Sequence, residues 1–300
     1  MRFRENDSVQ ANSQSLSPSL IEAFVQDGVV RIPQAFSPDW IELLRDGFSN
    51  AVANPSPRHS IRQIGGNGPA YREDYWVWSQ VPEFERFLRH SPVGEYAACA
   101  LEAERINLVM DNWFYREANC QARAPWHHDI SYFDFSGRMC VFWIPLEASK
   151  RGEGIEFVRG SHRWNKLFMR VYFDGHEIAG DPGWVNGECY ENPPAIDDAP
   201  DQYDLVSFDL ELGDCLCFDI RTLHGSLPGQ APMSSQRRFT VRLAAEDGRI
   251  CYRGDWAAAE RAEFEKYGHQ HGDAIDSDFF PRLWPKCESD KYSYKDNQCI

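Results

Sequence analysis

Five short runs between Arg105 and Leu243 decide the fold of this chain: INLVMDNWFY (106–115), MCVFWIPL (139–146), IEFVRG (155–160), DCLCFDI (214–220) and RRFTVRL (237–243). Each run is apolar or alternates apolar with polar residues, and stretches that contain Gly, Pro or Asp separate it from the next. Runs of this length and composition are typical of β-strands, and their spacing indicates a barrel or a sandwich. The sequence therefore predicts an all-β core over about residues 105–250.

The segment before this core is predicted to begin with two helices. Ser17-Pro18 opens the amphipathic run SLIEAFVQDG, and its last residue, Gly28, suits a helix C-cap. A short strand, VVRIP, follows at 29–33. Ser37-Pro38 starts a second helix, whose apolar residues recur every three to four positions as far as about residue 52. We expect both helices to pack on the outside of the barrel.

The domain organisation follows from these elements. Residues 1–17 are rich in Ser, Asn and Gln and are predicted to form a flexible arm. Residues 55–71 carry Pro, Gly and Asn clusters and are loop-like, whereas residues 256–267 favour a helix before a polar tail. We expect one domain over residues 18–300, because no internal repeat divides the chain.

Composition and charge limit the function classes. With 42% hydrophobic residues the chain has enough apolar side chains for a large core, and its net charge of -15 argues against binding to nucleic acid or anionic membranes. The nine cysteines include no C-x-x-C pair, which favours free thiols in a reducing compartment. There is no apolar run long enough for a membrane span and no signal-peptide pattern at the start, so we expect a cytoplasmic protein.

The motif WHHDISYF holds the first two candidate metal ligands, His127 and Asp129. At a spacing of two residues, both side chains project to the same face of an extended segment, whereas His128 points away. His224 follows the strand-like run GDCLCFDIRTL and precedes Gly225, where the backbone can approach a ligand closely. Two histidines and one carboxylate form the facial triad of non-haem iron oxygenases, so these residues are also the candidate catalytic centre. His162 is set aside, because Gly-Ser-His reads as a turn.

An organic acid that supplies electrons to such a site needs an anchor for its second carboxylate. 2-Oxoglutarate would chelate iron through its 2-oxo and C1 carboxylate oxygens, and its distal carboxylate suits the fork of an arginine. In the run QRRFTVR, Arg238 and Thr240 share one face of the predicted strand with Arg242, and Arg237 points the other way. Arg238 is therefore the first candidate and Arg237 the second.

The chain resembles the phytanoyl-CoA dioxygenase family in a series of motifs that occur in the same order: FVQDGVVRIPQAF, NWFYREAN, APWHHDISYF, CVFWIPLEAS, GIEFVRGSHRW, GDCLCFDIRTLHGS, QRRFTVRLAAED and DSDFFPRLWP. They cover about residues 20–286. The resemblance implies a double-stranded β-helix (jelly-roll, cupin-like) barrel that binds Fe(II), 2-oxoglutarate and O₂, with ascorbate as a supporting reductant. It implies that His127, Asp129 and His224 hold the iron, that an arginine of QRRFTVR binds 2-oxoglutarate, and that Trp143 and Arg116 lie near this co-substrate.

Two departures from the family pattern are His128, where the family usually has Gln, and Arg159, where it has Pro before the Gly-Ser-His. The number of residues between His224 and the double arginine is also slightly larger than in the family pattern. Both Arg237 and Arg238 therefore remain candidates for binding 2-oxoglutarate. The implied reaction is hydroxylation of a small molecule, or an oxidation that follows from it, with release of succinate and CO₂.

The sequence allows three alternatives to this reaction. A halogenase would lack the carboxylate of Asp129, and a cupin-like isomerase or metal hydrolase would have more histidines at the metal. A catalytically inactive barrel that binds a small ligand or a protein partner is the remaining one. The sequence leaves the substrate open among acyl-CoA esters, amino acids, polar acids, phosphonates and alkaloid- or terpenoid-like metabolites, because loops set specificity. It also leaves the oligomeric state open.

Overall fold

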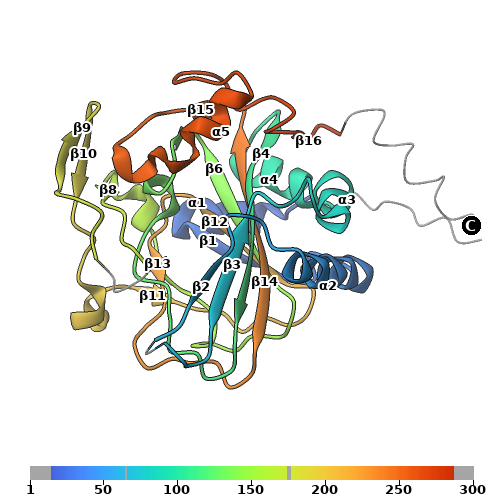
Figure 1. Cartoon of the computed structure of the whole chain (residues 1–300), viewed down its shortest axis with the longest axis vertical. Helices are drawn as coiled ribbons and strands as arrows, with labels where there is room; N and C mark the ends of the chain where they lie inside the picture. Colours follow the sequence, from blue (N-terminus) through green and yellow to red (C-terminus); the bar gives the residue numbers. More distant parts are fainter. Residues whose placement is uncertain (1–14, 65, 174–176, 287–300) are drawn as a thin grey trace, which may run out of the picture.

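The computed structural model describes residues 15–64, 66–173 and 177–286. Most of the arm predicted over residues 1–17, and the polar tail beyond residue 286, lie outside the described residues. The main element of the structure is a large antiparallel sheet, drawn end to end through the molecule in Figure 1. Its strands follow the order β1 (Val29–Ile32), β12 (Cys215–Asp219), β6 (Met139–Pro145), β14 (Gln236–Ala245), β4 (Ile106–Arg116), β3 (Tyr71–Tyr75) and β2 (Ser60–Arg62), and β16 (Arg282–Trp284) pairs with β4.

A smaller sheet completes the barrel. It contains β11 (Leu205–Val206), β7 (Glu156–Val158) and β13 (His224–Gly225), and an isolated β-bridge ties His127 to its edge. The ring of Phe157 in this sheet lies 5.0 Å from that of Phe218 in the large sheet, so the two sheets pack face to face at this end. This arrangement is the predicted double-stranded β-helix, with a cavity left between the sheets.

Short elements surround the two sheets. A three-stranded sheet of β8 (Leu167–Phe168), β10 (Glu188–Glu191) and β9 (Gly183–Val185) extends to one side in Figure 1, and β15 (Arg249–Ile250) pairs with β5 (Phe135–Ser136). Within the described part of the chain, five 3₁₀ segments lie in the connections: η1 (Asp129–Ser131), η2 (Ser161–Trp164), η3 (Ile196–Asp198), η4 (Pro200–Gln202) and η5 (Asp255–Glu260).

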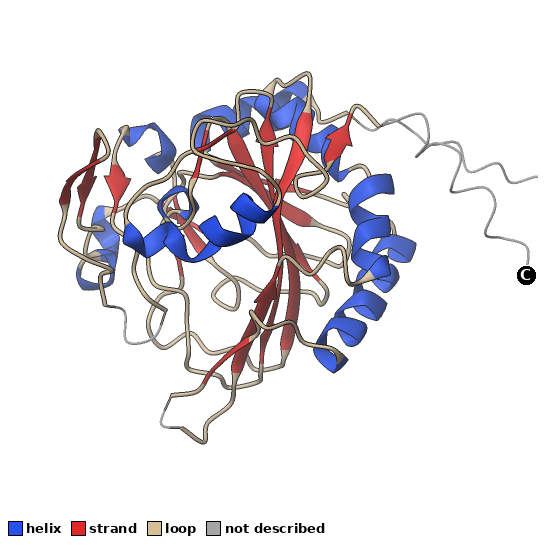
Figure 2. Ribbon diagram, turned by 45° about the horizontal axis from the view of Figure 1, so that its top comes forward, coloured by secondary structure: helices blue, strands red, loops and turns tan. Residues whose placement is uncertain are grey.

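Helices cover the outer face of the large sheet (Figure 2). The first begins as predicted, with Pro18 in its first turn and the Ser17 hydroxyl accepting the Leu20 amide at 3.3 Å, and it ends at Gly28, whose φ of 76° is left-handed. Side chains from these helices and from the sheet form the main hydrophobic core. The helices are α1 (Pro18–Asp27), α2 (Pro38–Ala53), α3 (Pro82–His90) and α4 (Val93–Leu101), and α5 (Arg261–Lys266) lies near the C-terminus.

Strand β14 connects the core to the cavity. Its alternate residues Phe239, Val241 and Leu243 are buried in the core under the helices. The residues between them line the cavity on the opposite face: Arg238, Thr240 and Arg242. The period of two seen in the sequence therefore separates an apolar face from a charged one.

On the neighbouring strand β4, the charged residue Asp111 does not face the cavity. Its side chain is fully buried, no hydrogen bond reaches either carboxylate oxygen among the described residues, and it does not line the cavity. Burial raises the pKa of Asp111 to about 7, and nearby backbone amides at Val77 and Trp78 offset only part of this effect. Asp111 therefore lies in the protein interior and not on the cavity wall.

Several boundaries differ from the prediction. The barrel extends beyond residues 105–250, because β1, β2, β3 and β16 pair into the large sheet from outside that range. The loop expected over residues 55–71 contains β2, and α3 and α4 were not predicted. The helix expected over residues 256–267 is split between η5 and α5.

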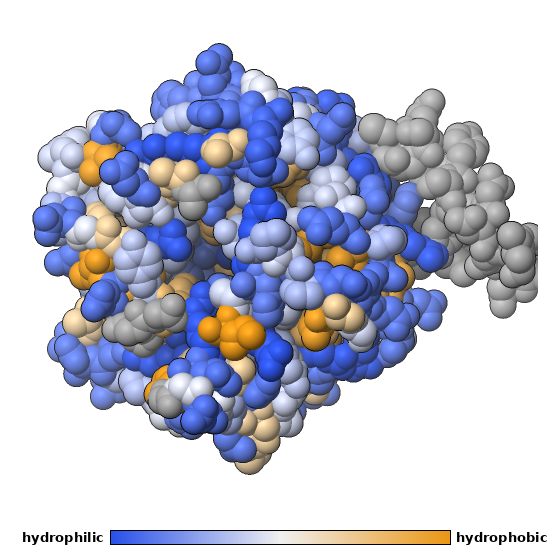
Figure 3. All heavy atoms as spheres, viewed as in Figure 1, coloured by the Kyte–Doolittle hydropathy of each residue, from blue (hydrophilic) through white to orange (hydrophobic). Residues whose placement is uncertain are grey.

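The face of the molecule in Figure 3 is mostly hydrophilic, with small separate hydrophobic patches. Among the described helices, none combines the length and apolarity needed to cross a lipid bilayer. The seven cysteines in the described part of the chain are free thiols, as the sequence predicted for them.

Candidate metal centre

His127, Asp129 and His224 come together at the edge of the smaller sheet. Their ligand atoms lie within 4.8 Å of one another, and all three side chains are buried. Asp129 Oδ1 is 3.4 Å from His127 Nε2 and 3.7 Å from His224 Nε2. Two imidazoles and one carboxylate converging on one point are the donor set of a mononuclear non-haem iron site.

Backbone carbonyls orient both imidazoles toward this point. His127 Nδ1 lies 2.7 Å from the Pro125 carbonyl oxygen, and His224 Nδ1 lies 2.9 Å from that of Thr222. Each Nδ1 therefore carries the proton and donates it, which leaves each Nε2 lone pair for a metal. Burial, together with neighbouring His127, lowers the pKa of His224 to about 3, so this imidazole is neutral and able to coordinate.

The local backbone reaches this geometry by a different route from the expected extended strand. His127 is held by reciprocal backbone hydrogen bonds with His224, of 2.9 and 2.8 Å, but Asp129 already begins the 3₁₀ turn η1. A Cβ on Gly225 would lie 3.0 Å from the Pro125 carbonyl oxygen. The glycine thus permits close approach of the segment that carries His127, and not of a ligand as the sequence suggested.

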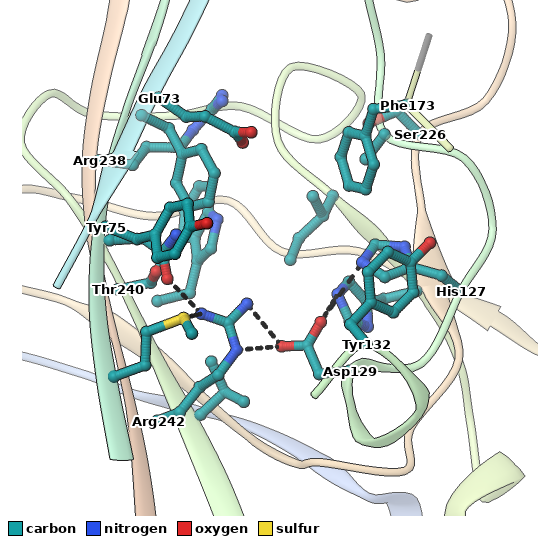
Figure 4. Close-up of a pocket in the computed structure, with 18 of the residues that line it drawn as sticks. Glu73, Tyr75, His127, Asp129, Tyr132, Phe173, Ser226, Arg238, Thr240 and Arg242 are labelled. Atoms are coloured by element: carbon teal, nitrogen blue, oxygen red, sulfur yellow. Dashed lines mark hydrogen bonds and ion pairs between the residues drawn. The ribbon is translucent and has the colours of Figure 1, made fainter. Parts of the chain in front are cut away.

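The second oxygen of Asp129 is occupied by Arg242, to which sequence reasoning assigned no role. Arg242 Nε and Nη2 lie 2.9 and 2.8 Å from Asp129 Oδ2, and Nη1 donates to Asn112 Oδ1 at 2.5 Å (Figure 4). Burial alone would raise the pKa of Asp129, but Arg242 and the two histidines hold this pKa well below its usual range. The sequence signal that could have identified Arg242 is its place on the same face of the predicted strand as Arg238 and Thr240.

His128 and His162, which the sequence pattern excludes as ligands, do not join this cluster. His128 Nε2 accepts the Phe168 amide at 3.0 Å and lies 2.5 Å from Ser131 Oγ, and burial lowers the pKa of His128 to about 3. His162 lies in the 3₁₀ segment η2, where its Nε2 is 3.1 Å from the Val25 carbonyl oxygen. Both side chains stabilise loops.

Arg238 lies at another wall of the same cavity. Its guanidinium is 4.9 Å from the centre of the Trp143 ring, and its Nη2 donates to the Gln236 side-chain oxygen and to the Glu153 carbonyl oxygen. Arg238 Nε and Thr240 Oγ1 have no hydrogen-bond partner among the described residues, and no described carboxylate pairs with Arg238. Burial lowers the pKa of Arg238 to about 10, so it keeps its charge near neutral pH.

Arg116 and Arg237 differ in their relation to this wall. Arg116 lines the cavity, where its Nη2 donates to the Cys120 and Gln230 carbonyl oxygens. Arg237 does not line it: its backbone amide and its guanidinium both bind Glu147 on the other face of β14. The structure therefore brings Arg238, Thr240, Trp143 and Arg116 to the cavity and leaves Arg237 outside.

The remaining wall is aromatic and charged. Asn112 and Tyr132 line it, whereas Arg123 lies outside it and forms an ion pair with Asp197. No sequence signal identified the rest of this wall, because its residues come from segments far apart in the chain: Arg62, Glu73, Tyr75, Phe133, Arg170, Phe173 and Glu260. Figure 4 shows several of them around a common space that the metal cluster closes at its base.

Comparisons with known proteins agree with this geometry. The family described as phytanoyl-CoA dioxygenase (PhyH) matches residues 24–238, which is more than half of the chain. Among curated proteins, a search finds no significant match.

Three solved structures are similar over most of the chain. The carbocyclase SnoK from nogalamycin biosynthesis has a TM-score of 0.67 at 17% identity, covering 89% of this chain and 96% of SnoK. The epimerase SnoN, in complex with Fe³⁺, α-ketoglutarate and nogalamycin RO, has a TM-score of 0.67 at 18% identity, with coverages of 88% and 97%. EctD from S. alaskensis, with 2-oxoglutarate and 5-hydroxyectoine, has a TM-score of 0.60 at 17% identity, with coverages of 81% and 80%. At these identities the likeness establishes the shared fold.

Proposed function

Because this chain belongs to the phytanoyl-CoA dioxygenase family, we propose that it is an iron(II)- and 2-oxoglutarate-dependent oxygenase that acts on a small molecule. The observation that carries the proposal is one cavity lined by both a His-Asp-His cluster and a buried arginine without a carboxylate partner. The single domain expected from residue 18 onward would hold the whole site. Free thiols favour a cytoplasmic location.

The cluster fits a divalent iron in donor chemistry and in charge. His127 Nε2, His224 Nε2 and Asp129 Oδ1 would be the ligands, and the carbonyl oxygens that accept from each Nδ1 fix the ring orientation. Arg242 binds Asp129 Oδ2, which favours coordination through Oδ1 alone. Iron bound there would supply the activation of O₂ and the oxidative decarboxylation of 2-oxoglutarate.

Arg238 would bind the distal carboxylate of 2-oxoglutarate. Its unpartnered Nε and the unpartnered Thr240 hydroxyl are buried polar groups that a carboxylate would satisfy, and such groups cost free energy when they stay unpaired. Trp143 supports the guanidinium from one side. Arg116 would add positive charge beside this site, with its Nη2 held by two backbone carbonyl oxygens.

The reaction proposed for the unknown substrate is hydroxylation of a C–H bond, or an oxidation that follows from it. One oxygen atom of O₂ would enter the substrate, and the other would enter succinate as CO₂ leaves 2-oxoglutarate. The three protein ligands leave three positions for the co-substrate and O₂, which supports this chemistry. Solved structures of the same fold include an epimerase and a carbocyclase, and product analysis distinguishes hydroxylation from those two outcomes.

Metal analysis and succinate release together test the proposal. The wild-type protein should bind one Fe(II) under anaerobic conditions and should release succinate with 2-oxoglutarate, O₂ and ascorbate. Replacement of His127, Asp129 or His224 by Ala should remove turnover and leave the far-ultraviolet circular dichroism unchanged. The matched control is His162→Ala, which should keep both the metal and turnover.

Two results would contradict the proposal. Full activity of the His224→Ala variant would contradict the assignment of His224 as a metal ligand. Loss of iron in the His162→Ala variant would contradict the assignment of the metal to the His127, Asp129 and His224 cluster. A protein that binds iron and 2-oxoglutarate but forms no succinate with any substrate would instead be the catalytically inactive barrel.

A further inference from the structure

Arg170 and Glu260 carry opposite charges and line a part of the cavity that contains neither the metal cluster nor Arg238. Arg170 follows β8, and Glu260 ends η5, so segments ninety residues apart bring them to one cavity. The other charged pairs on this cavity are neutralised internally, since Arg62 binds Glu73 and Arg242 binds Asp129. Arg170 and Glu260 form no ion pair with each other or with other described residues, although they are close enough for Arg170 to influence the pKa of Glu260.

Arg170 is fixed above one side of the metal cluster. Its guanidinium lies 5.1 Å from the centre of the Tyr132 ring, and that ring lies 5.0 Å from the ring of His127. Its Nη1 donates to the Trp256 carbonyl oxygen at 2.7 Å, whereas its buried Nε has no partner among the described residues. The guanidinium is therefore separated from a metal ligand by a single aromatic ring, and its Nε–H is available to a ligand.

Glu260 is held at the cavity wall by Tyr75. Tyr75 OH donates to its Oε1 at 3.2 Å, and its buried Oε2 has no partner in the described part of the chain. Tyr75 pairs in register with Asn112, the residue that binds Arg242. Figure 4 shows Tyr75 and Tyr132 on opposite sides of the space above Asp129.

Burial makes these unpaired groups costly in the absence of a ligand. Burial raises the pKa of Glu260, which means that its charged form is destabilised, and a cationic partner would offset that cost. A neutral ligand would leave both charges without a partner, and an anionic ligand would leave Glu260 unpaired. A ligand that carries both signs would satisfy both groups.

We propose that the substrate is a small zwitterion of the α-amino-acid type, whose carboxylate binds Arg170 and whose ammonium group binds Glu260. The inference rests on the proposed oxygenase function. A guanidinium fork matches a carboxylate, and the Tyr75 ring beside Glu260 adds a favourable surface for a cation. The α-carbon would then lie between Arg170 and Glu260, and its apolar side chain would extend into the part of the cavity lined by Tyr132, Phe133 and Phe173.

The test uses binding of the twenty standard L-amino acids to the anaerobic protein loaded with Fe(II) and 2-oxoglutarate. This complex has a visible absorption band, and a substrate that binds beside the metal shifts it without turnover. Each amino acid that shifts the band is compared with its N-acetyl derivative and its amide. The variants are Arg170→Gln and Glu260→Gln, and the matched controls are Arg237→Gln and Glu147→Gln, whose ion pair lies outside the cavity.

We expect at least one amino acid to bind, and each variant to weaken that binding by tenfold or more while 2-oxoglutarate binding stays unchanged. The amide should be insensitive to Arg170→Gln, and the N-acetyl derivative insensitive to Glu260→Gln, because each lacks the group concerned. Equal binding of the parent and both derivatives, or of wild type and both variants, would overturn the inference. If no amino acid shifts a band that does form, this inference alone fails, whereas absence of the band itself would refute the proposed function.

Discussion

Replacement of Arg238 by Gln should weaken binding of 2-oxoglutarate far more than the same change at Arg237. Arg238 is only 4% exposed and no described carboxylate satisfies it, so a bound co-substrate would supply its charged partner. Loss of a buried, charge-assisted pair of this kind costs on the order of 2–5 kcal/mol. At about 1.4 kcal/mol per factor of ten, the dissociation constant should rise roughly thirty-fold to a few thousand-fold.

Arg237→Gln is the matched control, because it removes the same charge from the adjacent position. Arg237 pairs with Glu147 on the other face of β14, where its side chain is 30% exposed, and such a pair contributes about 0–1 kcal/mol to stability. Its effect on 2-oxoglutarate should therefore be less than about twofold. Arg238→Lys, which keeps the charge but loses the fork, should fall between Arg238→Gln and wild type.

The assay is anaerobic titration of the Fe(II)-loaded protein with 2-oxoglutarate, followed by its visible absorption band. Initial rates of succinate formation should then show a raised 2-oxoglutarate requirement for Arg238→Gln, with less change in rate at saturation. If Arg237→Gln raises the requirement and Arg238→Gln does not, the assignment from strand parity and burial is wrong.

Three further predictions concern stability and product. Arg242→Met should destabilise the metal-free protein by about 3–5 kcal/mol in urea unfolding, because Asp129 becomes an unpaired buried charge; Mn(II) should recover part of this loss, and equal stability of variant and wild type would contradict it. For Asp111, whose folded pKa of about 7 exceeds its unfolded value, stability is lost as pH rises toward 7. The advantage of Asp111→Asn over wild type should therefore grow by about 2 kcal/mol from pH 5.5 to 8.5, and a constant difference would refute this. In chloride buffer under ¹⁸O₂ the product should carry a labelled hydroxyl group, since Arg242 helps hold Asp129 at the metal position; a chlorine isotope pattern in the mass spectrum would be the opposite result.

Local pattern in the sequence was sufficient for the elements whose form depends on near neighbours. The first helix was predicted from Ser17-Pro18 to Gly28, because a cap, a proline and a left-handed glycine act within a few residues. The alternation in RRFTVRL separated Phe239 from Arg238 for the same reason, since a strand places successive side chains on opposite faces. The sequence also predicted His127, Asp129 and His224 as a metal cluster, and the three side chains come together.

Only the tertiary structure decided which distant segments meet. It joined β2, β3 and β16 to a barrel predicted to start near residue 105, because strand pairing depends on hydrogen bonds between chain segments and not on the composition of any one segment.

Residue pairs across the cavity were equally outside the reach of local pattern. Arg242 lies 113 residues from Asp129 in the chain. Arg170 and Glu260 line the same cavity but come from segments far apart in the chain. No rule of sequence spacing connects the members of either pair. The parity of Arg238 was determined by the sequence, but its burial without a carboxylate, and the pairing of Arg237 with Glu147, were decided by the packing of β14 between the cavity and the helices. A strand fixes which side chains share a face, and only its neighbours determine what each face meets.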